Sequence, residues 1–369
     1  MKIILLAGAR PNFMKIAPVI RAMGRYNSVH SESVFQPVLV HSGQHYDYEM
    51  SRVFFEDLEI PEPDVHLNVG SGTHAGQTAG VMVEFEKALL DEKPGMVVVV
   101  GDVNSTLAGA IAAVKLHIPV AHIEAGVRSG DRSMPEEINR LLTDMISDYL
   151  FTPSAEASGN LKREGVPESR IFAVGNVMVD SLLFNKPKAE RSGVLGELGL
   201  KAGAYSLLTL HRAANVDDRE TLGKIAGAVS RIARDIPVVF PAHPRTRKNI
   251  EAFGMEGAFG NERIIFIKPQ GYIRFLSLLM GARFVMTDSG GVEPETTVLG
   301  VPCLTLMDST AWQETVTHGT NVLVGISAER IIEEARKIMD GRNKDRKIPP
   351  LWDGKAAERI VDVLAGGPG

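Results

Sequence analysis

The chain has 369 residues, of which 44% are hydrophobic and 23% are charged, a composition that excludes an intrinsically disordered protein. Its formal net charge of −5 argues against a protein that coats nucleic acid, and we expect no nucleic-acid partner. The one cysteine, Cys303, excludes an internal disulfide framework and a cysteine-based zinc site, and it favours a cytoplasmic location.

Membrane and export signals are not expected. The longest apolar runs, such as Met96–Val100, are strand-sized, whereas a helix that spans a bilayer needs about 20 apolar residues. The N-terminal apolar stretch ends after about five residues at Gly8, which is too short for the core of a secretory signal. We therefore predict no membrane partner and a first strand at the N-terminus.

The expected strands are short apolar runs that alternate with longer helical stretches. In the first half they are Ile3–Ala7, Pro37–His41, Met96–Val100, Val120–Ile123, Tyr149–Thr152 and Ile171–Val174; in the second half they are Ser206–Leu210, Val238–Pro241, Ile264–Ile267, Phe284–Thr287, Cys303–Leu306 and Val322–Val324. Runs as apolar as these are typical of parallel strands covered by helices on both faces. The alternation predicts an α/β fold with two doubly wound domains that face each other.

A polar and glycine-rich stretch, residues 176–204, separates the two sets of strands. We therefore predict an N-terminal domain of residues 1–175 and a C-terminal domain of residues 176–354. A last helix is expected at about Lys355–Leu364, and we expect the segment 355–369 to pack back onto the N-terminal domain.

Ligands of open α/β sheets bind beyond the carboxyl ends of the strands, so the residues at those ends are the first candidates for a site. After the first strand, Gly8 allows a tight turn and Pro11 can start a helix. Arg10 and Lys15 then lie where the N-terminus of a helix also favours anions. Two solvated basic residues are the alternative.

Carboxylates follow two further strands. Asp102 comes after Met96–Val100 and Glu124 after Val120–Ile123, while Glu136 and Arg140, four residues apart, share one face of an expected helix. Three carboxylates that meet at one site raise each other's pKa, which suits general acid–base catalysis. The alternatives are a helix cap for Asp102 and a surface ion pair for the two helix residues.

The second half repeats this arrangement with histidines and glycines. His211 and His243 each follow an expected strand, and two histidines in matching places indicate a site more strongly than one. The segment Ser289-Gly290-Gly291 follows another strand and opens a helix. Glycines let the backbone approach a ligand there, so the segment predicts a pyrophosphate-binding loop.

Other kinds of site find less support. The glycine-rich segment Gly70–Gly76 lacks the spacing of the common phosphate-binding loops, and we expect it to be a mobile active-site loop. His41 and His45 have helical spacing, but Ser42-Gly43 interrupts any helix between them, and no metal-binding motif occurs. We therefore predict no metal site.

Six motifs occur in order along the chain: Gly8-Ala9-Arg10-Pro11, Gly101-Asp102, His122-Ile123-Glu124-Ala125-Gly126, Pro135-Glu136-Glu137-Ile138-Asn139-Arg140, His211-Arg212 and Asp288-Ser289-Gly290-Gly291. Through them the chain resembles the non-hydrolysing UDP-N-acetylglucosamine 2-epimerases over nearly its full length. Each motif alone is a weak signal, but six in the same order make a specific match.

The resemblance implies a glycosyltransferase-B-like fold, in which two Rossmann-like domains hold a nucleotide sugar in the cleft between them. It implies reversible conversion of UDP-GlcNAc to UDP-ManNAc, for cell-surface polysaccharide precursors, by elimination of UDP to give 2-acetamidoglucal and by its re-addition. The partner it implies is a UDP-sugar, with no metal and no nicotinamide cofactor, and a homodimer is expected.

The resemblance also assigns roles to residues. It implies catalytic roles for Asp102, Glu124, Glu136 and His211. It implies that the sugar, the uridine or the diphosphate is bound by Arg10, Lys15, Arg140, Arg212, His243, Phe275, Ser289, Gly290, Gly291 and Glu295. Which carboxylate serves which face of C2 is left open.

Three segments depart from the family's usual pattern. Glu293-Pro294-Glu295 stands where Gln-Glu-Glu is usual, and Pro294 has no N–H to offer at that helix end. Thr310-Ala311-Trp312-Gln313-Glu314 replaces Thr-Glu-Arg-Pro-Glu, which removes a cation and adds an indole. Gln44-His45-Tyr46 replaces Gln-His-Arg where a second UDP-GlcNAc is implied to activate relatives, and this predicts weak or absent activation.

Three alternatives stay open. A sister epimerase acting on a UDP-2,3-diacetamido uronic acid would share Gly8-Ala9-Arg10-Pro11 and often carries a tryptophan near position 312. A retaining glycosyltransferase of the same fold would need an acceptor for turnover. A non-catalytic module that binds nucleotide sugars is the third alternative, and the several carboxylates argue against it.

Overall fold

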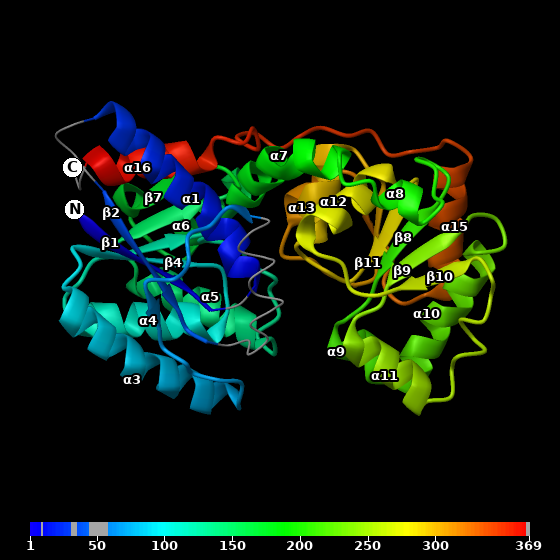
Figure 1. The fold of residues 1–369 in the computed structure, drawn as a ribbon, viewed down its shortest axis with the longest axis horizontal. Helices are drawn as coiled ribbons and strands as arrows, with labels where there is room; N and C mark the ends of the chain where they lie inside the picture. The colour runs from blue at the N-terminus through cyan, green and yellow to red at the C-terminus, as the bar shows by residue number, and fades with distance from the viewer. Residues whose placement is uncertain (9, 31–34, 44–57, 367–369) are drawn as a thin grey trace. The chain divides into compact units, whose positions relative to one another are not determined.

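The structure, a computed structural model, describes residues 1–8, 10–30, 35–43 and 58–366 (Figure 1). Within them the chain forms two compact units: unit 1 comprises residues 1–184 and 350–369, and unit 2 comprises residues 185–349. Each unit is built on one parallel β-sheet with helices packed on its faces. The predicted α/β fold with two doubly wound domains is confirmed.

Unit 1 contains a seven-stranded sheet with the strand order β3-β2-β1-β4-β5-β6-β7. Its strands are β1 (Lys2–Ala7), β2 (Gln36–His41), β3 (Val65–His66), β4 (Met96–Val100), β5 (Val120–Ile123), β6 (Tyr149–Thr152) and β7 (Ile171–Ala173). The helices that accompany it are α1 (Arg10–Val29), α3 (His74–Glu92), α4 (Asn104–Lys115), α5 (Pro135–Ile146), α6 (Ala155–Arg163), the 3₁₀ turn η1 (Glu168–Arg170), α7 (Val177–Glu190) and α16 (Ala356–Gly366).

Unit 2 contains a six-stranded sheet with the strand order β10-β9-β8-β11-β12-β13. Its strands are β8 (Ser206–Thr209), β9 (Val238–Pro241), β10 (Ile264–Ile267), β11 (Phe284–Thr287), β12 (Cys303–Thr305) and β13 (Asn321–Leu323). Its helices are α8 (Val194–Glu197), α9 (Ala213–Val216), α10 (Arg219–Ile232), α11 (Pro244–Ala252), α12 (Tyr272–Gly281), α13 (Val292–Leu299), α14 (Gln313–Thr317) and α15 (Ala328–Met339).

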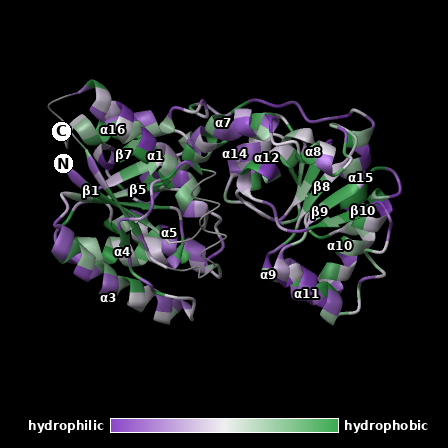
Figure 2. Cartoon of the chain, in the orientation of Figure 1, coloured by the Kyte–Doolittle hydropathy of each residue, from purple (hydrophilic) through white to green (hydrophobic). Residues whose placement is uncertain are grey.

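Helices bury both faces of each sheet, which is why the strands are continuous apolar runs rather than alternating ones. In unit 1, Ile4 and Leu6 belong to a core with α3 and α4 that includes Phe85, while the alternate residues Ile3 and Leu5 are buried as well. In unit 2, α10 and α15 pack on one face of the sheet. Figure 2 shows the central strands of both units in the hydrophobic colour.

The strand order of each sheet reverses at one place. From β1 the chain adds β2 and β3 on one side and then returns to place β4 on the other side of β1. In unit 2 the chain adds β9 and β10 on one side of β8 and then places β11 on the other side of β8. The carboxyl ends of strands that flank such a reversal are where ligands of open α/β sheets bind. Those ends carry Gly8 and Gly101 in unit 1 and His211 and Asp288 in unit 2.

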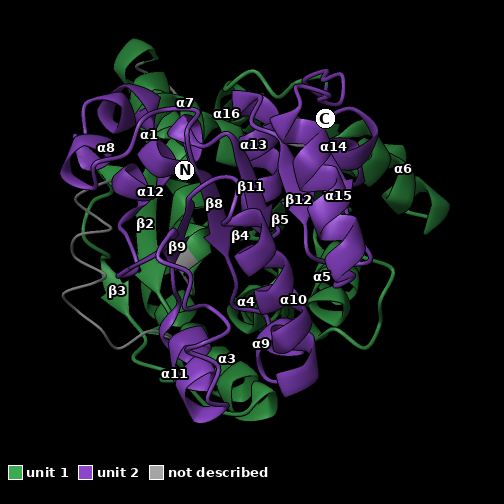
Figure 3. Ribbon diagram, turned by 90° about the vertical axis from the view of Figure 1, so that its right-hand side faces the viewer, with its two compact units in different colours: residues 1–184, 350–369 green, residues 185–349 purple. Residues whose placement is uncertain are grey.

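The chain leaves unit 1 within α7, between Phe184 and Asn185, and returns to it at Pro350 (Figure 3). After the return, the indole N–H of Trp352 donates to the carbonyl oxygen of Pro153 at 2.9 Å, and the indole is 2% exposed. The helix α16 then packs against α1. The last segment of the chain is thereby part of unit 1.

The N-terminus of α16 is capped by a carboxylate from α7. Asp180 accepts from the N–H of Ala356 at 3.2 Å and from the N–H of Ala357 at 2.8 Å. Burial, together with the nearby charge of Asp353, raises the pKa of Asp180 to about 6 despite these two donors. The cap ties α7 to the returning chain.

Two local predictions were wrong. The sequence pattern missed β3, which is only the two residues Val65–His66 and is too short to show a period. The expected loop Gly70–Gly76 ends earlier than predicted, because α3 begins at His74 and the Thr73 hydroxyl caps it by accepting from the N–H of Gly76 at 3.2 Å.

Gln44-His45-Tyr46, to which the prediction about activation refers, lies outside the described residues.

We expect Trp352→Ala to lower the free energy of unfolding by roughly 3–5 kcal/mol, because it empties a buried site and leaves the carbonyl of Pro153 without its donor. Trp352→Phe should cost less, since the ring is kept and about 1 kcal/mol of hydrogen bonding is lost. Denaturant unfolding measures both, with Ile348→Ala, an exposed site in the same connection, as the control. Equal losses in all three variants would contradict the anchoring role.

Candidate functional site

The turn after β1 is held against the end of β4. Asn12, in the first turns of α1, accepts from the N–H of Gly8 at 3.3 Å and donates to the carbonyl oxygen of Val100 at 2.9 Å. A Cβ on Gly8 would lie 1.7 Å from the hydroxyl oxygen of Ser105, so only glycine fits this approach. The two strand ends that flank the reversal in unit 1 are therefore fixed side by side.

Lys15 of α1 and Glu124, which follows β5, form a buried ion pair beside these strand ends. Lys15 Nζ lies 2.6 Å from Glu124 Oε1, and Glu124 is only 7% exposed. Its second carboxylate oxygen, Oε2, is buried and has no hydrogen-bond partner among the described residues. Glu124 also has a φ of +74°, a left-handed conformation that residues other than glycine hold only where their surroundings impose it. One oxygen of the group is thus held by Lys15, and the other is open to a further hydrogen bond.

Asp102 is held by α5. Arg140 forms ion pairs with Asp102 and, at 2.8 Å, with Glu137, and Asn139 donates to the carbonyl oxygen of Asp102 at 2.9 Å. Burial alone would lower the pKa of Arg140, but Asp102, Glu137 and Glu124 outweigh it and raise that pKa. The guanidinium therefore stays charged and links Asp102, which follows β4, to Glu137 on α5.

In the first turn of α5, Glu137 rather than Glu136 is buried. Burial would raise the pKa of Glu137, but the N–H groups of Ser129 and Gly130 and the Arg140 guanidinium outweigh it and lower that pKa. Glu136 is half-buried, and its carboxylate has no hydrogen bond or ion pair among the described residues. The predicted catalytic role of Glu136 stays a prediction.

The N-terminus of α3 lies beside these groups. Asn104, which begins α4, donates to Gln77 Oε1 at 2.7 Å, and its amide nitrogen is 3.2 Å from His74 Nδ1. Asn104 Oδ1 also accepts from Asn139 at 3.3 Å. The segment after the glycine-rich run is thus joined to the Asp102 turn. Arg10 begins α1, and its side chain lies outside the described part of the chain.

In unit 2, Asp288 holds the turn after β8 in place through hydrogen bonds. Its fully buried carboxylate accepts from the backbone N–H groups of His211 and Arg212 at 3.0–3.1 Å and from Asn215 Nδ2 at 3.2 Å. His211 Nδ1 is 3.0 Å from Asp288 Oδ1, while the imidazole as a whole is 44% exposed. Burial would raise the pKa of Asp288, but the contacts with His211 and Arg212 lower it. Asp288 thereby fixes one edge of the His211 ring and leaves the other exposed.

His243 caps α11 and lies near His211. Its Nδ1 accepts from the N–H of Arg245 at 3.2 Å, and the two imidazole centroids are 6.2 Å apart. Burial, His211 and Arg245 all lower the pKa of His243. The ring is therefore neutral at pH 7, and since Nδ1 accepts, Nε2 carries the hydrogen.

The predicted pyrophosphate loop lies between β11 and α13. The N–H of Ser289 donates to the Thr287 hydroxyl at 3.0 Å, Ser289 and Gly290 are half-buried, and Gly291 is exposed. Trp312 is 7% exposed and packs beside this loop, with its indole 3.8 Å from where a Cβ on Gly290 would lie. Phe275 on α12 and Arg212 are both half-buried.

Two carboxyl groups are buried just inside α13. Tyr272 donates to Glu295 Oε1 at 2.9 Å, and Thr310 donates to Glu293 Oε2 at 2.6 Å. Burial raises the pKa of Glu293 and of Glu295 to about 7 in each case. Near neutral pH both groups are thus partly uncharged, which reduces their repulsion of an anion at the loop.

The chain is similar to proteins of one known family. The family model of UDP-N-acetylglucosamine 2-epimerase matches residues 27–365. A UDP-N-acetylglucosamine 2-epimerase of Methanocaldococcus jannaschii is 45% identical over 373 residues, which cover 100% of both chains. The chain belongs to the UDP-N-acetylglucosamine 2-epimerase family.

Solved and curated relatives extend this assignment. A crystal structure of the Methanocaldococcus jannaschii UDP-GlcNAc 2-epimerase in complex with UDP-GlcNAc and UDP has a TM-score of 0.90 at 46% identity and covers 100% of both chains. The UDP-2,3-diacetamido-2,3-dideoxy-D-glucuronate 2-epimerase of Pseudomonas aeruginosa is 44% identical, with 99% of each chain covered. The predicted family and the glycosyltransferase-B-like fold are confirmed, and the family is one of enzymes.

The sequence did not reveal several residues of this epimerase-family chain that hold the site residues in place. Asn12, Glu137, Asn139 and Asp144 each hold a turn or a charged partner of the predicted residues. One signal was present: Glu137, Arg140 and Asp144 are spaced by three and four residues, so charged groups line one face of α5, and that face is buried. A run of charges on the buried face of a helix indicates partners elsewhere in the fold.

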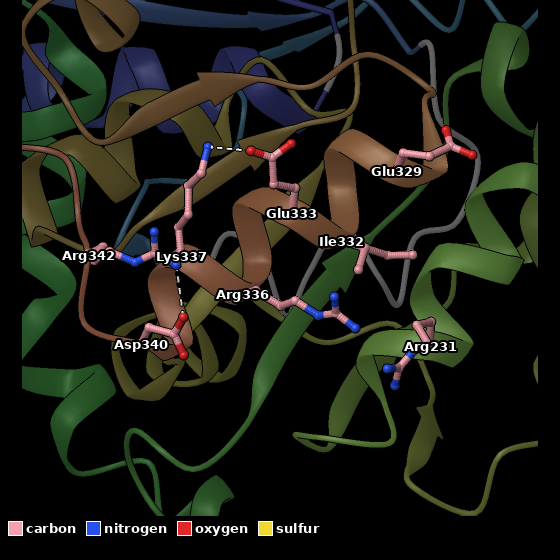
Figure 4. Close-up of a pocket in the computed structure, with 8 residues that line it drawn as sticks. All are labelled: Arg231, Glu329, Ile332, Glu333, Arg336, Lys337, Asp340 and Arg342. Carbon is pink, nitrogen blue, oxygen red and sulfur yellow. Dashed lines mark hydrogen bonds and ion pairs between the residues drawn. The ribbon is translucent and has the colours of Figure 1, made fainter.

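Other features of the described residues lie apart from these groups. No cluster of three or more His, Cys, Asp or Glu side chains suited to a metal ion occurs among them. Nor do the described residues include a helix whose length and hydropathy suit a bilayer crossing. A pocket of about 570 Å³ lies between α10 and α15 (Figure 4), but its lining is charged and largely self-paired, as in Lys337 with Glu333 at 2.8 Å. None of the predicted site residues lines it.

We expect Asp288→Asn to destabilise unit 2, because an amide offers one acceptor where the carboxylate serves several donors, and its NH₂ would face the N–H groups of His211 and Arg212. Breaking a buried charged contact of this kind costs roughly 3–5 kcal/mol. Calorimetric unfolding measures the loss. Asp217→Asn is the matched control, since Asp217 is exposed and pairs with Arg245, and it should change stability little. A wild-type melting profile for Asp288→Asn would contradict the prediction.

Proposed function

We propose that this chain interconverts UDP-GlcNAc and UDP-ManNAc by epimerisation at C2. The observation that carries the proposal is the ion-paired Glu124, whose second oxygen is buried without a partner among the described residues; it follows β5, next to β4 and its Asp102. A carboxylate so placed has one oxygen fixed and one available, which is what proton transfer requires. Membership of the epimerase family supports the same reaction.

The proposed chemistry is elimination followed by addition. The C2 proton of a GlcNAc ring is not acidic, so its removal is coupled to cleavage of the C1–O bond. A carboxylate of unit 1 takes the C2 proton, the C1–C2 double bond forms, and the bonding pair of C1–O leaves with UDP, giving 2-acetamidoglucal. A proton delivered to the other face of C2, with UDP re-added at C1, completes the epimerisation. Glu124 and Asp102 are the proposed acid–base groups, and Glu136 is a third candidate.

Stabilisation of the leaving diphosphate is the other requirement, because negative charge develops there as C1–O breaks. Unit 2 offers the Ser289–Gly291 loop at the N-terminus of α13, the Arg212 guanidinium and the N–H donor of neutral His243. We assign these groups, with His211, to the nucleotide diphosphate. Phe275 and Glu295 are assigned to the uridine, while Arg10, Lys15 and Arg140 are assigned to the sugar and phosphates. The use of the product in cell-surface polysaccharide, the cytoplasmic location and the homodimer stay predictions.

In D₂O, with EDTA and without added nicotinamide, we expect the wild type to place deuterium at C2 of UDP-GlcNAc and to form UDP-ManNAc. Glu124→Gln and Asp102→Asn should each slow this exchange at least roughly 10²-fold, because each removes a group that moves a proton. NMR at C2 follows the exchange. Glu84→Gln is the control, since Glu84 on α3 is partly exposed and pairs with Lys87. Wild-type rates in both site variants, or activity that EDTA abolishes, would overturn the mechanism.

A second candidate is C2 epimerisation of a UDP-2,3-diacetamido uronic acid. The relative of Pseudomonas aeruginosa named for that activity is 44% identical, against 45% for the Methanocaldococcus jannaschii UDP-GlcNAc 2-epimerase. Trp312, which the sequence associates with this second group, packs against Gly290 of the proposed diphosphate loop. Overall identity therefore does not separate the two substrates, and a direct comparison is needed.

We expect kcat/KM for UDP-GlcNAc to exceed that for the UDP-diacetamido uronate by at least about tenfold, equal to about 1.4 kcal/mol. The added uronate carboxylate would bring a further negative charge close to the carboxylates of Glu124 and Asp102, which pair with Lys15 and Arg140. Parallel assays with the two nucleotide sugars at limiting concentration measure the ratio. A preference for the uronate by the same margin would make the second candidate the function.

A further inference from the structure

A buried pair lies behind the two carboxylate turns of unit 1, and the proposed chemistry does not use it. His122 is in β5 and is fully buried, and Asp144 is on α5 and is 1% exposed. His122 Nδ1 is 2.7 Å from Asp144 Oδ1, and His122 Nε2 is 2.9 Å from the carbonyl oxygen of Gly101. Both ring nitrogens therefore face oxygen atoms at hydrogen-bond distance.

Neither of these oxygen atoms, Asp144 Oδ1 and the carbonyl oxygen of Gly101, carries a hydrogen that it could donate. A backbone carbonyl can only accept, and Asp144 is ionised: burial alone would raise its pKa, but His122, Arg128 and the N–H of Gly126 lower it. A neutral imidazole carries one N–H, so one of its two contacts would join two acceptors. Both contacts are hydrogen bonds only where each ring nitrogen of His122 carries a hydrogen.

Arg128 also contacts the pair. Arg128 Nη1 is 2.7 Å from Asp144 Oδ2, and Arg128 Nε is 2.9 Å from Glu164 Oε1. Asp144 is thus contacted inside the fold by both His122 and Arg128, whereas Glu164 is exposed to solvent.

Asp144 holds the turn that carries Glu124 at both of its ends. One oxygen, Oδ1, faces His122, two residues before Glu124, and the other, Oδ2, accepts from the N–H of Gly126, two residues after it, at 3.0 Å. Glu124 itself has the left-handed φ of +74°. A strained residue of this kind keeps its conformation only where the surrounding structure over-determines it, and Asp144 supplies that constraint.

The second nitrogen of His122 reaches the other turn. Its acceptor, Gly101, directly precedes Asp102 and has a φ of +70°. The backbone N–H of Gly101 in turn donates to the carbonyl oxygen of Ile123, directly before Glu124, at 3.1 Å. One imidazole therefore joins the turn of Asp102 to the turn of Glu124.

We propose that the His122–Asp144 pair is a positioning device, in which an imidazolium that donates from both ring nitrogens sets the relation between the Asp102 and Glu124 carboxylates. The proposal rests on the proposed function, because it assigns the pair to the placement of the acid–base groups. The nucleotide-binding groups of unit 2 take no part in it. The pair therefore governs the rate of proton transfer at C2 rather than the binding of the nucleotide.

The protonation state is tested without turnover. In ¹⁵N-histidine NMR of the wild type, the resonances of His122, identified by their loss in His122→Gln, should show a directly bonded proton on both ring nitrogens at the assay pH. A His122 with a single ring N–H would overturn the double-donor assignment. Asp144→Asn removes the anionic partner, and it should convert His122 to the neutral form.

Kinetics test the positioning role. His122→Gln and Asp144→Asn should each lower kcat for C2 deuterium exchange about 10²-fold, the effect of misplacing a reacting group by about 1 Å. KM for UDP-GlcNAc and calorimetric binding of UDP should stay near the wild-type values. The matched control is His117→Gln, because His117 is an exposed histidine of the same unit, after α4, and this variant should keep wild-type kinetics.

The outcomes separate this proposal from others. A parallel loss of kcat, of affinity for UDP and of thermal stability would show a merely structural role and overturn the proposal, as would an unchanged kcat in His122→Gln. Absence of C2 exchange in the wild type with either nucleotide sugar would overturn the proposed function instead. The NMR measurement would then still decide whether His122 donates from both nitrogens.

Discussion

Charged side chains at the carboxyl ends of the unit 1 strands are buried in groups that neutralise one another. An ion taken out of water without a partner loses several kcal/mol of hydration, so each group persists only if an opposite charge comes to it from another element. Lys15 on α1 meets Glu124 after β5, and Arg140 on α5 meets Asp102 after β4. The partners come from different strands and helices. The contacts that neutralise the buried charges therefore also fix where the site residues lie.

Unit 2 meets the same constraint with a single carboxylate. Asp288 is surrounded by donors from the β8 turn, so its charge is spread over hydrogen bonds rather than paired with a lysine or arginine. Nearby, burial raises the pKa of Glu293 and of Glu295 to about 7, so these carboxyl groups are partly neutral at the pH of the cell. An anion that approaches the loop after β11 therefore meets N–H groups and little opposing charge.

The two units thus share a topology and divide the chemistry that we propose. Each sheet reverses its strand order once, and each places polar groups at the strand ends beside the reversal. In unit 1 those groups are ion pairs that contain a carboxylate oxygen without a partner among the described residues, which suits proton transfer. In unit 2 they are neutral donors, a guanidinium and a helix N-terminus, which suit a diphosphate. The two units share one sheet topology, and they differ in the charges that they place at the strand ends.

The sequence by itself determined the fold class, nearly all of the described strands and the strand ends at which Asp102, Glu124, His211 and Ser289 lie. Continuous apolar runs show buried strands directly, because that pattern is local along the chain. The two-residue strand β3 and the start of α3 at His74 were missed, since so short a strand shows no period and a glycine-rich run hides a helix start. Motifs in order also sufficed to show the family.

Only the tertiary structure decided which charges pair. Arg140 lies within helical reach of both Glu136 and Glu137 in sequence, yet its partners are Glu137 and Asp102, which lies 38 positions away. The left-handed backbone of Glu124 and the double contact of His122 are likewise absent from any local pattern. Pairing of buried charges depends on distances between separate strands and helices and on the loss of water around them, and both arise only when the chain has folded.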